Sequence, residues 1–224
     1  MRPLPLRRRA LARAAVFGVA FTVPVAVLAY LVRAEVDAVV VLDQRAVQAA
    51  TDYTRDHPAV REALLIWQEV FRARWVNLAA TLLCAWVWRR HGLTTRALWA
   101  FLTIMAAWAL QLGAKGLVQR ARPVVEDAVA HAPGSSFPSG HVTNTAAVAV
   151  TLTLLVWPLL GTRGRVVVPV VAAAATLLTG VDRVMLGAHY PSDVVAGIAL
   201  GTALAGASYL GYSGWSASAP DRET

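Results

Sequence analysis

Long runs of apolar residues, separated by short polar stretches, fill most of the 224-residue chain. A helix that crosses a bilayer needs about 20 mostly apolar residues, whereas a buried helix in a soluble protein rarely has more than about 14 in a row. The pattern therefore predicts an all-α, polytopic membrane helical bundle with about six transmembrane helices. These are expected at residues 14–31, 75–88, 98–118, 142–160, 166–181 and 192–210.

Two segments depart from this pattern. Residues 34–72 mix acids, arginines and apolar residues around a break at His57-Pro58, which predicts an outer loop with one or two amphipathic helices at the membrane interface. Residues 213–224 are small and polar and are expected to be disordered. The length suits a single membrane-embedded domain over residues 1–224, with its core at 98–210. Gly197 and Gly201, four residues apart, predict close helix packing in the last span.

Charge supports the membrane assignment. Only 15% of the residues are charged and 57% are hydrophobic, whereas a soluble domain usually has about 25% charged residues. The net charge of +8 comes from arginines that flank apolar segments, so no nucleic-acid partner is expected. Arginine clusters at residues 7–13, 89–96 and 163–165 fall on one side, which the positive-inside rule places in the cytoplasm.

Three groups of polar residues stand at the ends of predicted spans. They are Lys115 with Arg122-Pro123, then Pro138-Ser139-Gly140-His141, and then Arg183 with His189 and Asp193. The loop that holds the first two groups and the loop that holds the third are separated by two crossings, so they must share a side. The charge rule makes that side the exterior. We therefore expect one site at the outer face.

The first two groups have the chemistry of an anion site. Fixed cations stabilise the charge that spreads over a phosphoryl group, and Lys115 and Arg122 are two helical turns apart, so they could share a helix face. Ser139 is a plausible N-cap for the next span, and Gly140 would let backbone N–H groups approach a ligand closely.

The third group has the chemistry of a nucleophile. Pro191 suits the first turn of the last span, which puts Asp193 where its side chain can reach back to His189. A carboxylate bonded to one imidazole nitrogen leaves the other nitrogen unprotonated. Each group alone has an ordinary explanation, such as a cation near the lipid headgroups or a helix cap. Their convergence on one side indicates function, since charged groups at membrane depth are costly.

Together the three groups resemble the signatures of the type 2 phosphatidic acid phosphatase (PAP2) superfamily over roughly residues 98–210, with the fold that this family shares with haloperoxidases. The resemblance implies that His189 forms a phosphohistidine, that Asp193 orients it, and that His141 protonates the leaving oxygen and then activates water. It also implies that no metal or other cofactor is needed. The expected ligands of the phosphate are Lys115, Arg122, Ser139, Gly140 and Arg183. Asp182 departs from the family pattern, which usually has serine there, and could bond Arg183, bond Arg120 or turn away.

Three functions remain open at this stage. The chain could hydrolyse a phospholipid or polyprenyl phosphate at the outer face of the plasma membrane, with phosphatidic acid, phosphatidylglycerol phosphate and undecaprenyl pyrophosphate as candidate substrates. It could instead transfer the phosphoryl group to another alcohol, or transport or bind lipid phosphates without catalysis. No protein partner is predicted. The loop at residues 119–138 and the first outer loop are expected to select the substrate.

Overall fold

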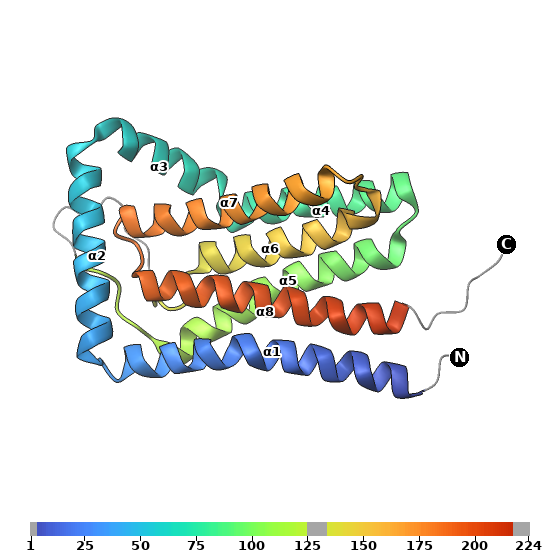
Figure 1. Ribbon diagram of the computed structural model, residues 1–224. Helices are drawn as coiled ribbons and strands as arrows, with labels where there is room; N and C mark the ends of the chain where they lie inside the picture. The colour runs from blue at the N-terminus through green and yellow to red at the C-terminus, as the bar shows by residue number, and fades with distance from the viewer. Residues whose placement is uncertain (1–3, 125–133, 217–224) are drawn as a thin grey trace.

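The computed structural model describes residues 4–124 and 134–216. These residues form eight α-helices and one short 3-10 helix: α1 (Leu4–Arg33), α2 (Asp37–Asp56), α3 (Pro58–Val70), α4 (Ala73–His91), α5 (Thr94–Val118), α6 (Gly140–Val156), η1 (Trp157–Leu159), α7 (Gly164–Met185) and α8 (Pro191–Ser216). Six long helices, α1 and α4 to α8, run side by side (Figure 1). The predicted all-α membrane bundle is confirmed.

Five of these helices are long and apolar enough to cross a membrane, namely α1, α5, α6 with η1, α7 and α8. The remaining predicted span corresponds to α4, which has 19 residues and packs against α5 and α6 but is not among the five. Its arginines explain the difference, since Arg74 stands near its start and Arg89 and Arg90 near its end. By length and composition, five helices rather than the predicted six or so qualify as membrane spans among the described residues. α4 is the sixth long helix of the bundle.

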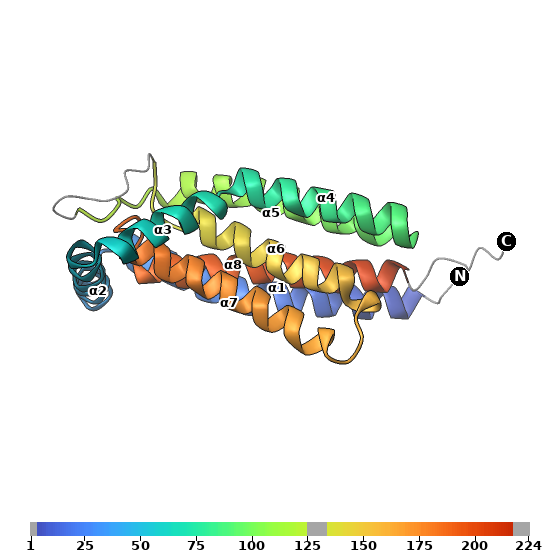
Figure 2. The ribbon, with the colours of Figure 1, turned by 90° about the horizontal axis from the view of Figure 1, so that it is seen from above.

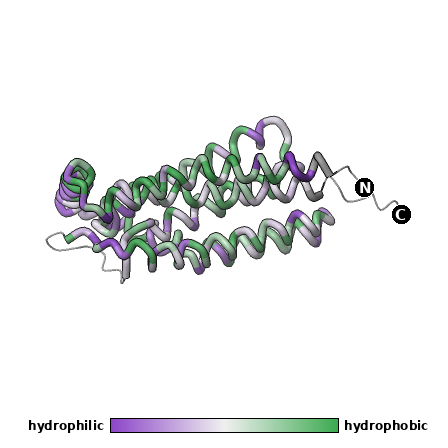
Figure 3. The backbone as a smooth tube through the Cα atoms, turned by 90° about the horizontal axis from the view of Figure 1, so that it is seen from below, coloured by the Kyte–Doolittle hydropathy of each residue, from purple (hydrophilic) through white to green (hydrophobic). Residues whose placement is uncertain are grey.

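The segment between α1 and α4 holds two helices. α2 crosses one end of the bundle at a steep angle and is seen end-on in Figure 2, and α3 leads from it back to α4. One face of α2 is buried against α7 and α8, formed by Asp43, Val47, Thr51 and Thr54. This helical spacing of buried positions identifies the face that packs on the bundle. Figure 3 shows hydrophilic positions on α2, whereas the long helices are mostly apolar along their middle.

The end of the chain corrects one prediction. α8 continues to Ser216, so residues 213–216, expected in a disordered tail, are helical. The rest of the predicted tail, residues 217–224, lies outside the described residues.

α8 packs between α1 and α6, and glycines make this close approach possible. A Cβ added at Gly201 would lie 2.4 Å from the Thr143 carbonyl oxygen and 2.8 Å from Ala146 Cβ. At Gly197 it would lie 3.1 Å from the Ser139 carbonyl oxygen. The close packing predicted from the glycine spacing is therefore confirmed, and the positions that touch these glycines belong to the N-cap and the first two turns of α6.

Substitution of Gly201 by valine is expected to destabilise the protein by about 1–3 kcal/mol or more, because the side chain would have to push α6 and α8 apart. Gly211 on the same helix is the matched control, since a Cβ there meets no atom within 4 Å. Thermal unfolding in detergent should show a lower Tm for Gly201→Val and little change for Gly211→Val. Equal melting temperatures for the two variants would contradict this account of the helix interface.

Candidate active site

The three polar groups singled out in the sequence meet at the end of the bundle that α2 covers (Figure 1). The arginine clusters near the N-terminus, at the α4–α5 turn and at the α6–α7 turn all lie at the opposite end. The structure thus brings the loops before α6 and before α8 to one end, as counting the crossings predicts.

His189 lies in the loop just before α8, and its side chain is buried, with 3% of the residue exposed. Its Nδ1 atom is 3.5 Å from Oδ2 of Asp193, the third residue of α8. This separation brings a carboxylate and an imidazole into electrostatic contact but is too long for a good hydrogen bond. Asp193 Oδ2 also accepts a hydrogen bond of 2.9 Å from the Tyr190 N–H, so the carboxylate reaches back over the preceding turn as the sequence predicts.

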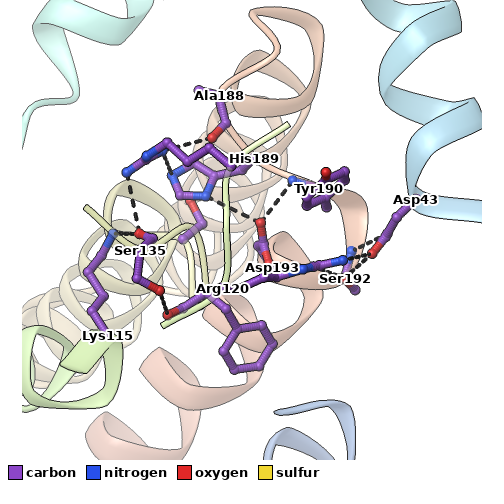
Figure 4. Close-up of polar contacts among 12 residues, drawn as sticks. Asp43, Lys115, Arg120, Ser135, Ala188, His189, Tyr190, Ser192 and Asp193 are labelled. Atoms are coloured by element: carbon purple, nitrogen blue, oxygen red, sulfur yellow. Dashed lines mark hydrogen bonds and ion pairs between the residues drawn. The ribbon is translucent and has the colours of Figure 1, made fainter. Parts of the chain in front are cut away.

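The other ring nitrogen of His189 faces a cation. Nε2 is 3.3 Å from Nη1 of Arg122, which also donates to the Ala188 carbonyl oxygen at 2.8 Å. Figure 4 shows the His189 ring with the Asp193 carboxylate on its Nδ1 side, and the Arg122 guanidinium faces the other ring nitrogen. A cation on one side and a carboxylate on the other therefore face the two nitrogens of a single imidazole ring.

The structure joins Lys115 and Arg122 in a way that helical spacing did not predict. α5 ends at Val118, and Gln119 takes a left-handed conformation with φ of 50°, so Arg122 lies in the segment after the helix. The two cations therefore do not share a helix face. They meet instead at the Ser135 carbonyl oxygen, which accepts from Lys115 Nζ at 2.9 Å and Arg122 Nη2 at 3.4 Å (Figure 4).

The start of α6 supplies the second group. Ser139 occupies the N-cap position, as predicted, although its hydroxyl makes no capping hydrogen bond. Its backbone N–H donates instead to the Asp193 carbonyl oxygen at 3.1 Å and ties α6 to α8. Ser139 Oγ and His141 Nε2 are buried and find no hydrogen-bond partner among the described residues, so both remain able to bond a ligand. Gly140 is held close to α5, since a Cβ there would be 2.9 Å from Gln111 Oε1.

Arg183 near the end of α7 is bound by its neighbours. Its Nε donates to Asp182 Oδ2 at 2.7 Å and its Nη2 donates to the same oxygen, while Nη1 donates to Gln68 Oε1 on α3 at 2.7 Å. Of the three possibilities for Asp182, the structure shows the bond to Arg183. The charge of this guanidinium still acts on His141 and Arg122, so it belongs electrostatically to the same site.

Comparison with known proteins places this arrangement in a family. The pattern of the PAP2 superfamily matches residues 96–216, more than half of the chain and all three polar groups. The chain belongs to the PAP2 superfamily. A crystal structure described as a transmembrane PAP2-type phosphatidylglycerolphosphate phosphatase from Bacillus subtilis has the same fold, with a TM-score of 0.79 and 24% identity over 92% of this chain and 98% of that one.

Sequence relatives match shorter stretches of this PAP2 chain. Lipid A 1-phosphatase from Rhizobium etli is 48% identical over 71 residues, 32% of this chain and 27% of the relative. Decaprenylphosphoryl-5-phosphoribose phosphatase from Mycobacterium tuberculosis is 38% identical over 98 residues, 42% of this chain and 49% of the relative. Phosphatidylglycerophosphatase B from Bacillus subtilis is 34% identical over 93 residues, 40% and 45% of the two chains. The matches thus span between about a quarter and a half of these relatives.

Two residues of this PAP2 site were missed by the sequence reasoning. Arg120 was considered only as a partner of Asp182, but it binds Asp193 and Asp43, with side-chain contacts of 2.7 and 2.8 Å. Asp43 lies on the buried face of α2, which precedes the matched residues 96–216 in the sequence. The sequence did contain a signal for Asp43, because this acid directly follows the apolar run at residues 38–42. An acid next to such a run is a candidate for burial, and a buried carboxylate needs a partner.

Burial sets the protonation state of the histidine in this PAP2 site. Removal from water lowers the pKa of His189 to about 4. The negative charge of Asp193 opposes this shift, while Arg122 and Lys115 add to it. The imidazole is therefore neutral at pH 7, which is the protonation state in which an imidazole nitrogen is able to act as a nucleophile.

Proposed function

We propose that this chain is a PAP2-type phosphatase that hydrolyses a membrane lipid phosphate or polyprenyl pyrophosphate through a phosphohistidine on His189. The observation that carries the proposal is the environment of the imidazole, with Nε2 3.3 Å from Arg122 Nη1 and Nδ1 3.5 Å from Asp193 Oδ2. Family membership supports it, and the three relatives named above are all phosphatases of lipid-linked phosphates by name.

In the first step, the lone pair on His189 Nε2 attacks phosphorus in line with the leaving oxygen. The P–N bond forms as the bond from phosphorus to that oxygen breaks, and the electron pair leaves with the oxygen. His141 donates a proton to the oxygen, so the lipid departs as an alcohol, or as a monophosphate when the substrate is a pyrophosphate. Asp193 balances the positive charge that develops on the imidazole of His189.

In the second step, water attacks the phosphohistidine and His141, now neutral, accepts a proton from it. The P–N bond breaks, its electron pair returns to Nε2, and phosphate leaves with His189 in its starting state. Both steps place extra charge on the phosphoryl oxygens. Lys115 and Arg122 are positioned to stabilise this charge, together with the Ser139 hydroxyl and the free N–H groups at the start of α6. Arg183 joins them when a phosphoryl oxygen replaces one of its present partners.

The site is proposed to face the exterior, that is, the periplasmic side of the plasma membrane. The support is the charge distribution, because the arginine clusters at residues 7–13, 89–96 and 163–165 lie at the end of the bundle remote from His189. Impermeant thiol labelling of intact cells measures this directly, using cysteines introduced one at a time into a chain with Cys84 replaced by alanine. Labelling at Asp56 without labelling at Gly161 is expected, and the reverse pattern would invert the orientation.

Phosphate release from the purified protein in detergent tests the activity. Lipids that resemble the relatives' named substrates form the first panel, together with phosphatidic acid and undecaprenyl pyrophosphate, all in EDTA because no metal is expected to take part. Turnover of at least one lipid is expected. Product analysis with an added lipid alcohol separates hydrolysis from phosphotransfer, whereas binding without any turnover would favour the transporter or binder and count against the proposal.

The low pKa of His189 predicts an unusually acid-tolerant enzyme. Because the neutral imidazole is the nucleophile, kcat/KM should persist below pH 6 and fall only as the pH approaches about 4, where His189 gains a proton. Profiles measured with two substrates whose phosphates ionise differently would separate the enzyme's titration from the substrate's. A fall centred near pH 6.5, the ordinary value for histidine, would show that burial does not control this group.

A further inference from the structure

A chain of buried polar contacts connects α2 to the carboxylate beside His189. Its members are Asp43 on α2, Arg120 after α5, and Ser192 and Asp193 in the first turn of α8 (Figure 4). Asp43 is 2% exposed and Asp193 is fully buried, and 10% of the Arg120 side chain is exposed. A buried carboxylate is costly unless a cation or hydrogen-bond donors satisfy it, so each contact in this chain has a large effect on the others.

Arg120 is the bridge between the two carboxylates. Nη1 donates to Asp193 Oδ1 and to Ser192 Oγ, each at 2.7 Å, and Nη2 donates to Asp43 Oδ2 at 2.8 Å. The planar guanidinium fixes the angle between these bonds. It also lies over the Tyr190 ring, 4.1 Å from the ring centre, which prevents it from swinging away.

Asp43 completes the bridge by binding the start of α8 as well. Its Oδ1 accepts from the Ser192 N–H at 3.0 Å, and its Oδ2 accepts from the Ser192 hydroxyl. One carboxylate on α2 thus holds both Arg120 and the first turn of α8. The first turn of α8 carries Asp193, so the position of its carboxylate is fixed from two directions.

The charges explain why a second carboxylate is needed. Alone, Arg120 would neutralise Asp193 and draw it away from His189, because a bidentate arginine pair is strong. Asp43 takes one side of the guanidinium and balances its charge, so that Asp193 binds through Oδ1 only and keeps Oδ2 toward the imidazole. Burial by itself would lower the pKa of Arg120, but Asp193 and Asp43 together raise that pKa above its ordinary value. The guanidinium therefore stays charged.

We propose that Asp43 is a positioning residue of this enzyme, which acts through Arg120 and Ser192 to keep Asp193 Oδ2 directed at His189 Nδ1. The proposal rests on the proposed phosphatase function, and it gives α2 a part in catalysis although α2 lies outside the residues that match the family. Held in this way, Asp193 keeps the proton of the neutral imidazole on Nδ1 and leaves Nε2 free to attack phosphorus.

The test compares Asp43→Asn with Asp52→Asn. Asp52 is on the same helix, but it is exposed and pairs with Arg55, three residues away, so its substitution removes the same charge without touching the site. The amide introduced by Asp43→Asn retains an oxygen for the Ser192 N–H. The expected result is a fall in kcat of about 10- to 100-fold with KM changed less than about threefold, as for other residues that orient a catalytic group. Asp52→Asn should retain wild-type values.

A spectroscopic readout does not depend on knowing the substrate. In protein with 15N-labelled histidine at pH 7, the ring nitrogens of His189, assigned with a His189 variant, report which nitrogen carries the proton. We expect the proton on Nδ1 in the wild type and in Asp52→Asn, and a mixture of the two tautomers in Asp43→Asn. A general loss of stability would lower the signal of all five histidines and would not move a proton on one of them.

The outcomes separate this inference from the function on which it rests. Wild-type protein without phosphatase activity, but with the tautomer change, would overturn the proposed function and support the positioning. Active protein in which Asp43→Asn has wild-type kcat and the wild-type tautomer would overturn the positioning and leave the function standing. If Asp43→Asn does not fold, Ser192→Ala removes the hydroxyl shared by Asp43 and Arg120 and should show the same tautomer change, and an unchanged spectrum there would refute the proposal.

Discussion

Replacement of His189 by asparagine should lower kcat by at least about 10⁴-fold, because in the proposed mechanism its imidazole forms the covalent intermediate and an amide cannot. Asparagine is close to the imidazole in size and polarity and leaves Arg122 with a polar neighbour, so the fold should survive. Substrate binding should survive as well, since the cations proposed to hold the phosphate are untouched. The measurement is phosphate release at saturating substrate, alongside acid-labile labelling with a 32P substrate to detect the phosphohistidine.

The control is His91→Asn, at the end of α4 remote from the site, which should leave the rate and the labelling unchanged. Loss of labelling in His189→Asn together with its retention in the control would assign the nucleophile. Residual labelling of His189→Asn at the wild-type level would move the covalent chemistry to another residue and refute the mechanism.

Asp193→Asn is expected to have the second largest effect, a fall in kcat of about 10³- to 10⁴-fold with a small change in KM. A comparable loss follows when the orienting aspartate of a serine protease triad becomes asparagine, because the amide favours the wrong tautomer of the histidine. In this chain the same change also leaves Arg120 with one carboxylate instead of two. Thermal unfolding should therefore be measured beside the kinetics.

A matched substitution, Asp37→Asn in the first turn of α2, removes an exposed carboxylate. It should change neither kcat nor the temperature of thermal unfolding. The decisive comparison for Asp193→Asn is between its effect on kcat and its effect on substrate binding. An Asp193→Asn protein that turns over at the wild-type rate but binds substrate weakly would mean that this carboxylate does not orient the nucleophile.

The parts of the site that depend on local chain geometry were predictable from the sequence. Pro191 starts α8, and this alone places Asp193 two residues later, where its carboxylate can meet the end of the preceding loop. The common side of the histidine-bearing loops also followed from the sequence, since two long apolar segments must each cross the bundle. Signals of this kind depend on a few neighbouring residues or on the length of an apolar segment. They can therefore be recognised in the sequence without knowledge of the tertiary packing.

The missed features depend on contacts between distant segments. Asp43 and Arg120 are 77 residues apart, and nothing near either one in the sequence specifies the other. The meeting of Lys115 and Arg122 depends on the left-handed Gln119, a conformation that a residue other than glycine rarely adopts and that helical periodicity cannot reveal. Tertiary hydrogen bonds decide these positions, and only the folded chain shows them.

α4 illustrates the same limit for a whole helix. Its sequence is too polar to stand among the five apolar helices, yet it is part of the bundle. Part of the explanation is a buried hydrogen bond of 3.0 Å from Asn144 Nδ2 on α6 to Asn77 Oδ1 on α4. Polar side chains that bond across helices are satisfied inside a bundle, although a hydropathy profile counts them against it.

The bond between Arg183 and Gln68 has a consequence for how substrate binds at the site and how phosphate leaves it. Nη1 of this arginine is occupied by an amide oxygen from α3, and Trp67, the residue before Gln68, donates from its indole to the Thr179 hydroxyl on α7. Nη1 has two N–H groups and Gln68 accepts from one of them, so in the proposed mechanism a phosphoryl oxygen would either take the second N–H group beside the amide or displace the amide from the first. Under the proposed function, substrate binding and the anchoring of α3 to α7 are therefore linked through a single guanidinium, and release of inorganic phosphate would leave its Nη1 atom bound to the protein's own amide alone.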